Sequence, residues 1–204
     1  LPPNNVDALI FSALSYIDYD DIVPSVPEKT ISLRDAAKKV LELPDQERKF
    51  RVKKDLDLLN MVAETERFGS IGLCYYKNIF DVEKETQFAA ITYVLDDGSA
   101  FLTFRGTDKT IIGWKEDFNM AFKSPIPSQE EAVRYLEKSA LYCSGKILTG
   151  GHSKGGNLAV YAAAKCRENV QSRIAKIYSH DGPGFLEATL QKPEFLKIAS
   201  RIEK

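Results

Sequence analysis

The chain has 204 residues, 44% of them hydrophobic, so it can bury a core without help from disulfides or metal ions. Its 28 Lys+Arg residues balance 29 Asp+Glu residues, and the net charge of -1 provides no basic surface for nucleic acid or an anionic membrane. These values predict a globular protein and exclude a polyanionic partner.

The three cysteines, Cys74, Cys143 and Cys166, are widely separated and form no zinc-binding pattern with histidine. We therefore expect reduced thiols, a cytoplasmic location, and neither a metal nor a cofactor. No apolar run approaches the roughly 20 residues that span a bilayer. The chain begins with Leu1 rather than Met, which suggests a segment of a longer protein.

The first 68 residues are predicted to be mainly helical. After Asn4, apolar residues recur with helical spacing as far as Ile17, and Ser32 to Asp35 has the form of a capping box before a second short helix. A charged helical stretch over residues 46–66 follows. We expect these helices to form an N-terminal extension, and the sequence leaves open whether they act as a lid.

From Gly69 the pattern changes to that of a sheet core, residues 69–204. A run of aromatic and β-branched residues contains the hairpin turn Asp97-Gly98. A helix opened by Ser128, a strand at 146–149, a helix of small residues and a strand at 173–179 come next. Alternating helices and strands predict one α/β domain over 1–204, with a mostly parallel sheet flanked by helices.

The segment LTGGHSKGGNLA joins a predicted strand to the helix of small residues. Residues 151–155 match G-x-S-x-G, the nucleophile elbow, in which a serine occupies a strained strand-to-helix turn. Gly151 and Gly155 lack the Cβ atoms that would keep the strand and the helix apart. At the helix start, the amide of Lys154 can point at an oxyanion. The pattern predicts that Ser153 is a nucleophile in a sparsely allowed backbone conformation.

Two other interpretations of this turn remain. A G-x-S-x-G pattern occurs often by chance, so the glycines can form a simple tight connection. They can also hold a phosphate at the helix N-terminus. The phosphate interpretation is weaker, because the segment matches neither G-x-x-x-x-G-K-[ST] nor G-x-G-x-x-G.

A second segment, TFRGTD, ends a predicted strand at residues 103–108. Its Thr107 can turn an amide and a hydroxyl over the carboxyl end of the sheet, where an acyl-enzyme needs another oxyanion donor. Thr107 and Lys154 are therefore the candidate oxyanion residues, although Thr107 can instead be a turn cap. Trp114 and Phe118, four residues apart, are expected to pack in the core.

Together, TFRGTD, GWKEDFNMAF, GGHSKGGNLAVYAA and YSHDGPGF resemble the Mbeg1-like family over nearly the whole chain. That family is similar to the class 3 lipases of the α/β-hydrolase superfamily, which carry FRGT or FRGS at the oxyanion hole and GHSLGG at the nucleophile. The resemblance implies an α/β-hydrolase-like fold with a serine-hydrolase site. Lys154 replaces the leucine of GHSLGG, and its charge beside the site is expected to disfavour a long-chain lipid substrate.

A catalytic serine needs a histidine base and usually a carboxylate that orients it. His152 lies inside the elbow, where we expect it to pack or to form a loop hydrogen bond. His180 precedes the candidate acid Asp181, whereas in α/β-hydrolases the histidine follows the acid in the chain. Asp181 occupies either the position of the acid or that of a turn residue in DGPG. No histidine and no further strand are predicted after it. We expect the base and the last strands beyond Lys204, and this segment alone to be inactive.

The leading hypothesis is a serine hydrolase of the esterase or lipase type that acts on a small-molecule acyl substrate through an acyl-enzyme on Ser153. The alternative is a non-catalytic α/β-hydrolase-fold module that binds a small acyl or anionic ligand or a protein partner. The sequence specifies neither the substrate nor the oligomeric state.

Overall fold

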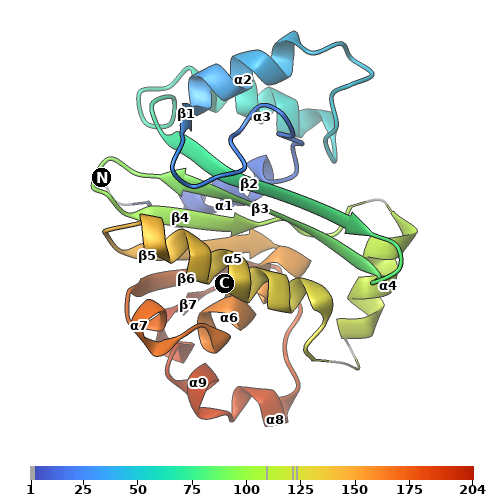
Figure 1. Ribbon diagram of the computed structural model, residues 1–204, viewed down its shortest axis with the longest axis vertical. Coiled ribbons are helices and arrows are strands. Elements are labelled where there is room, and N and C mark those ends of the chain that lie inside the picture. Colours follow the sequence, from blue (N-terminus) through green and yellow to red (C-terminus); the bar gives the residue numbers. More distant parts are fainter. Residues whose placement is uncertain (1–2, 109, 121, 123) are drawn as a thin grey trace.

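The computed structural model of the protein describes residues 3–108, 110–120, 122 and 124–204, except for the side chain of Ile112. Within these residues, seven strands form one sheet whose order follows the chain. Helices cover both faces of the sheet (Figure 1), which confirms the α/β class. The strands are β1 (Ile31–Ser32), β2 (Gly72–Asp81), β3 (Thr86–Val94), β4 (Ala100–Phe104), β5 (Ile147–His152), β6 (Ile174–His180) and β7 (Ile202–Glu203).

The sheet is mixed rather than mostly parallel. Strands β1 to β4 pair antiparallel, whereas β4 to β7 pair parallel. The connections from β2 to β3 and from β3 to β4 are tight turns, which are too short for the crossover that a parallel pair requires. The prediction of a mostly parallel sheet is therefore correct only for the C-terminal half.

A strand does follow β6, contrary to the prediction. Strand β7 pairs in parallel with β6, with Ile177 opposite Ile202 and Tyr178 opposite Glu203. The chain reaches it through α8 (Glu187–Leu190), α9 (Pro193–Leu196) and a 3-10 turn at Ala199–Arg201. Two residues are too few to give a detectable alternation of apolar and polar positions, so the sequence pattern missed this strand.

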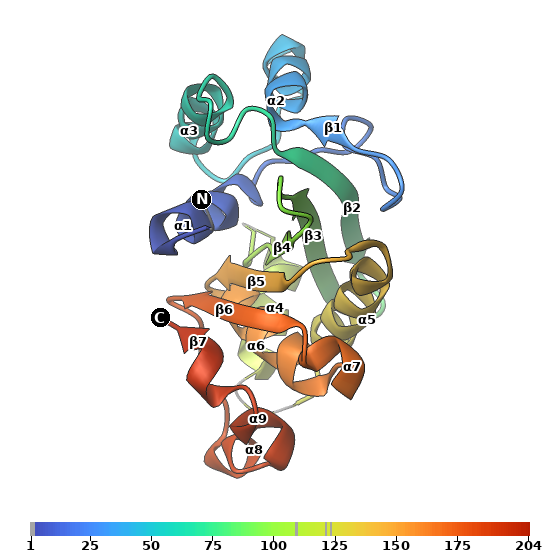
Figure 2. The ribbon, with the colours of Figure 1, turned by 90° about the vertical axis from the view of Figure 1, so that its left-hand side faces the viewer.

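The N-terminal helices form the layer on one face of the sheet. They are α1 (Asn5–Leu14), α2 (Leu33–Glu42) and α3 (Lys53–Ala63), so the helix expected over 46–66 begins later than predicted. Asn4 and Ser32 cap α1 and α2 by accepting backbone hydrogen bonds, and the cap at Ser32 confirms the sequence prediction. Figure 2 shows α1 lying along the middle of the sheet. Phe11 of α1 packs against Phe101 of β4, with ring centroids 5.0 Å apart.

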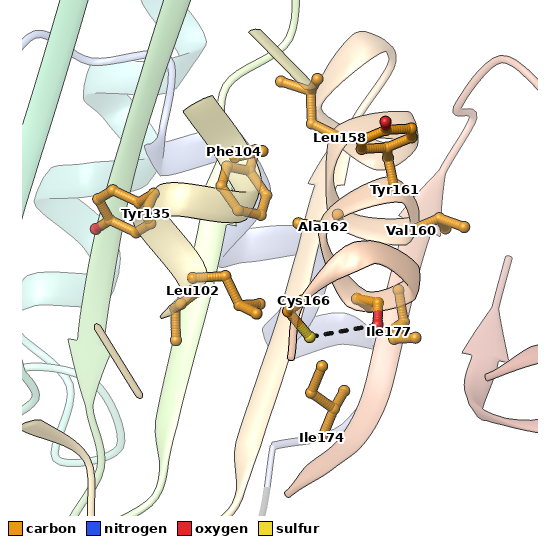
Figure 3. Packing of buried hydrophobic residues seen from close by; sticks show 14 of the residues in the cluster. Leu102, Phe104, Tyr135, Leu158, Val160, Tyr161, Ala162, Cys166, Ile174 and Ile177 are labelled. Carbon is orange, nitrogen blue, oxygen red and sulfur yellow. Dashed lines mark hydrogen bonds between the residues drawn. The ribbon is translucent and has the colours of Figure 1, made fainter. Parts of the chain in front are cut away.

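The opposite face carries α4 (Ile111–Met120), α5 (Pro127–Tyr142), α6 (Lys154–Lys165) and α7 (Glu168–Gln171). Helix α6 packs flat on the sheet because its inner face consists of small and aliphatic residues. Figure 3 shows Leu158 and Ala162 of this helix facing the β4 side chains Leu102 and Phe104. Side chains alternate along β4, so Leu102 and Phe104 join the hydrophobic core on the α6 face and Phe101 joins the core on the α1 face.

Candidate active site

Ser153 occupies the turn between β5 and α6. Its backbone angles are φ 55° and ψ -130°, a sparsely populated conformation for a residue with a Cβ that costs on the order of 1 to 3 kcal/mol. The Ser153 amide donates to the carbonyl of His180 at 2.9 Å, and its carbonyl accepts from the amide of Gly156 at 2.9 Å. The predicted backbone conformation of Ser153 is confirmed.

Gly151 and Gly155 allow three backbones to meet at this turn. A Cβ on Gly151 would lie 2.5 Å from the carbonyl oxygen of Phe104 and 2.6 Å from that of Gly155. A Cβ on Gly155 would lie within 2.9 Å of the carbonyl carbon of Phe104. Such separations are well inside van der Waals contact, so both positions require glycine. The close approach of strand and helix predicted from the sequence is confirmed.

The segment after β4 lies against the elbow. Phe104 pairs with Gly151 in the parallel β4–β5 ladder. Two residues further on, a Cβ on Gly106 would lie 2.6 Å from the carbonyl oxygen of His152. This packing brings Arg105 and Gly106 beside the turn that carries Ser153, and Thr107 follows directly. That the amides of Thr107 and Lys154 converge on one point remains a prediction.

The hydroxyl of Thr107 is engaged by helix α4. It donates to a carboxylate oxygen of Asp117, and the other oxygen, Oδ1, is buried without a partner among the residues described. Burial raises the pKa of Asp117, while the hydrogen bond from Thr107 opposes the rise. Because the hydroxyl is occupied, Thr107 has its backbone amide as the group that can bind an oxyanion.

The charge of Lys154 is buried and paired rather than presented to a ligand at the elbow, which corrects the expectation of a free charge there. The side chain is completely buried. Its Nζ donates to Glu116 Oε2 at 2.7 Å, to the carbonyl of Gln87 at 2.6 Å and to Gln87 Oε1 at 3.0 Å. Three acceptors satisfy all three ammonium hydrogens, and the carboxylate neutralises the charge. Lys154 therefore gives no reason to disfavour an apolar substrate.

Glu116 connects this ion pair to two further elements. Its carboxylate accepts from the amide of Gln87 in β3 and from the amide of Ser128 in α5, both at 3.2 Å. Helix α4 must turn Glu116 inward to make these bonds, which places Trp114 and Phe118 on its outer side. They are 70% and 68% exposed, so the prediction that they pack in the core is wrong.

The two histidines lie on the α1 side of the sheet. His152 Nδ1 is 2.9 Å from the hydroxyl of Tyr16, which fits the expected loop hydrogen bonding. Burial lowers the pKa of His152, and the nearby charge of Arg51 lowers it further. The ring of His180 stacks on Tyr178 with centroids 6.1 Å apart. Within the part of the chain that the structure describes, neither imidazole hydrogen bonds to Ser153.

Asp181 follows β6 directly, at the same edge of the sheet as Ser153. It is exposed and has a φ of 53°, and its charge acts on His152 electrostatically. No hydrogen bond from a described residue to its carboxylate is present, so its assignment as the catalytic acid stays a prediction. The loop after it is held by Asn157 of α6, whose Nδ2 donates to the carbonyl of Pro183 at 3.0 Å.

Sequence reasoning missed two residues of this site. Tyr16 contacts His152 across 136 positions, and no local pattern predicts such a contact. Asn157 is a buried amide in a helix of small residues, and its Oδ1 accepts from Gln129 Nε2 at 2.8 Å. Its signal is the lone polar side chain in GGNLA, which must find hydrogen-bond partners when buried.

Comparison with known proteins gives one match. A sequence profile of the Mbeg1-like family matches residues 62–204, more than half of the chain, and the matched range contains Thr107, Ser153 and Asp181. No curated protein and no solved structure matches the chain. No helix among the described residues combines the length and apolarity needed to cross a bilayer. The chain belongs to the Mbeg1-like family.

Proposed function

We propose that this protein is a serine hydrolase of the α/β-hydrolase type, which cleaves an ester or related acyl bond through an acyl-enzyme on Ser153. The observation that carries the proposal is the strained backbone of Ser153 between β5 and α6. A fold maintains such strain where the position of one side chain matters. Membership in the Mbeg1-like family and the mixed α/β fold are compatible with this chemistry.

In the proposed reaction, Ser153 Oγ attacks the acyl carbon and loses its proton to a base. The carbonyl oxygen then becomes an oxyanion, which the amides of Lys154 and Thr107 bind, and the N-terminus of α6 adds a favourable field. The C–O bond to the leaving group breaks, the leaving oxygen takes up the proton, and water releases the acyl group in a second, equivalent step. Asp181 is the proposed acid that orients the base.

An alternative function is favoured by one observation. Neither imidazole of the described residues reaches Ser153 by a hydrogen bond, and a base is needed to activate the serine. A module with this geometry and no base binds an acyl or anionic ligand without cleaving it. The identity of the base remains a prediction.

A fluorophosphonate probe tests the proposal directly, because it reacts with activated serines. In the full-length protein we expect one adduct, located on Ser153 by peptide mass spectrometry and lost in Ser153→Ala. Ser172→Ala removes an exposed serine hydroxyl and should leave labelling unchanged. A protein that unfolds cooperatively yet takes up no probe would refute the hydrolase and support the binding module.

Replacing Thr107 by Ala should lower turnover by less than the roughly 100- to 1000-fold typical of losing an oxyanion donor, because the backbone amide remains. Some loss is expected, since the variant leaves the Asp117 carboxylate without its hydroxyl donor. Thr107→Ser keeps that hydroxyl and should stay close to the parent protein. The measurement is kcat on a short p-nitrophenyl ester. A thousandfold loss in the alanine variant alone would assign the effect to the hydroxyl.

A further inference from the structure

Two buried cations lie beside the elbow, and among the described residues just one of the two has a buried counter-ion. Lys154 is paired with Glu116. Arg105, the residue directly after β4, is 9% exposed, and its Nη2 donates to the neutral amide oxygen of Asn78 at 3.0 Å. Its Nε is buried without an acceptor, and no described carboxylate forms an ion pair with it. A buried charge without an opposite charge is unfavourable, so Arg105 lacks an anion.

Arg105 lines a cavity whose walls combine positive charge with apolar surface. The cavity measures about 420 Å³. Two carboxylates also line it: Asp18 pairs with Lys49 at 3.6 Å, and Asp108 Oδ1 accepts from the neutral amide of Thr110 at 2.8 Å. The lining thus holds three cations, Lys49, Arg51 and Arg105, against two carboxylates. The lining residues that matter for a ligand are Tyr16, Phe50, Arg51, Phe80 and Arg105.

Arg51 supplies a second guanidinium to the same cavity. It lies over the ring of Tyr16, with its Cζ 4.0 Å from the ring centroid. Its Nε is also buried without an acceptor among the described residues, and its ion pair with Asp55 is long, at 3.7 Å. Planar guanidinium groups with free N–H donors match the oxygens of carboxylates and phosphates.

The cavity lies next to the candidate nucleophile. The hydroxyl of Tyr16 is 2.9 Å from His152 Nδ1, and His152 directly precedes Ser153. On the other side, Arg105 precedes Gly106, whose backbone packs against the carbonyl of His152. Two lining residues, Tyr16 and Arg105, therefore lie beside the turn that carries Ser153.

We infer that this cavity binds the anionic group of a small ligand, a carboxylate or a phosphate, through Arg105 and Arg51. Phe50 and Phe80, which are 36% and 54% exposed, form an apolar wall for the carbon atoms attached to that group. The further statement that the ligand is a substrate, an ester carrying an anion, rests on the proposed function. Binding itself does not depend on catalysis.

The binding test uses Ser153→Ala, so that no turnover is needed. Succinate and inorganic phosphate are titrated separately by calorimetry, and the one that binds more tightly identifies the anion. We expect a Kd below about 1 mM for at least one of them. Arg105→Met should weaken binding at least tenfold, whereas Arg134→Met, which removes an exposed cation on α5, should not change it. No binding of either anion up to about 10 mM would overturn the inference.

A structural role for Arg105 predicts a different result. If Arg105 were there for stability, Arg105→Met would lower the melting temperature in the absence of anion. We expect that temperature to be unchanged or higher, because the variant removes an unpaired buried charge, and we expect the anion-induced rise to be lost. If Arg105→Met does not fold, Arg51→Met carries the test. Anion binding that survives both substitutions would contradict the site.

Kinetics separate this inference from the proposed function. On the active protein, the ratio of kcat/KM for p-nitrophenyl hemisuccinate to that for p-nitrophenyl acetate should fall at least tenfold in either arginine variant. Labelling of Ser153 without anion binding or discrimination would refute the inference and keep the hydrolase. Anion binding without labelling would keep the cavity site and refute the hydrolase.

Discussion

Lys154→Met is expected to lower the free energy of unfolding by about 3 to 5 kcal/mol. Methionine is close to lysine in volume, so the loss comes from charge and hydrogen bonding rather than from a cavity. The substitution leaves Glu116 as a buried carboxylate without its cation, and both oxygens of Gln87 lose a donor. Equilibrium unfolding in denaturant, followed by circular dichroism, measures the change.

Two controls make this prediction specific. Lys176→Met breaks the pair with Glu203, which has a similar length of 2.8 Å but is about half exposed, and should cost less than about 1 kcal/mol. The double variant Lys154→Met/Glu116→Met should recover part of the loss, because it removes both charges together. Recovery is incomplete, since the amides of Gln87 and Ser128 then lack an acceptor. If Lys154→Met and Glu116→Met each lowered the free energy of unfolding only slightly, and their losses added in the double variant, the buried pair would contribute no more than a surface pair.

Gly155→Ala is the second substitution with a large expected effect. The new Cβ would lie within 2.9 Å of the carbonyl carbon of Phe104, and a strand backbone cannot rotate out of the way as a side chain does. We expect a loss of about 3 kcal/mol, the upper end of the usual cost of overpacking. The gain in helix propensity from Gly to Ala is about 1 kcal/mol and does not offset it.

The same substitution should also abolish labelling of Ser153. Phe104 leads directly into Arg105 and Gly106, so moving its carbonyl shifts the segment that ends in Thr107. Gly184→Ala is the matched control, because a Cβ at that position meets no atom within 4 Å. Its effect should stay within about 0.5 kcal/mol. Equal stability of the two variants would contradict the close packing at the elbow.

Local features of the site could be predicted from the sequence. The conformation of Ser153 follows from a strand, a glycine pattern and a helix that are adjacent in the chain, so a short segment contains all the information. The same holds for the cap Ser32, which bonds to a residue three positions away. The hydrogen-bonding role of His152 could be expected in kind, but its partner Tyr16 could not.

Features that depend on distant contacts could not be predicted. The direction of the Lys154 side chain is set by Gln87 and Glu116, which lie 67 and 38 positions away. The expectation that its charge lies free at the site was wrong because a long side chain can be buried when it finds a complete set of acceptors. The exposure of Trp114 follows from the same contact, because Glu116 determines which side of α4 faces inward.

The Lys154–Glu116 pair also constrains how the family can evolve. A change of Lys154 to leucine alone would leave Glu116 as a buried carboxylate without a cation. An evolving sequence would therefore pass through a destabilised protein. A change of Glu116 to a neutral residue alone would likewise leave Lys154 as a buried cation without a carboxylate. Relatives with leucine at the first position should therefore lack an acid at the second, and the two positions should covary in an alignment.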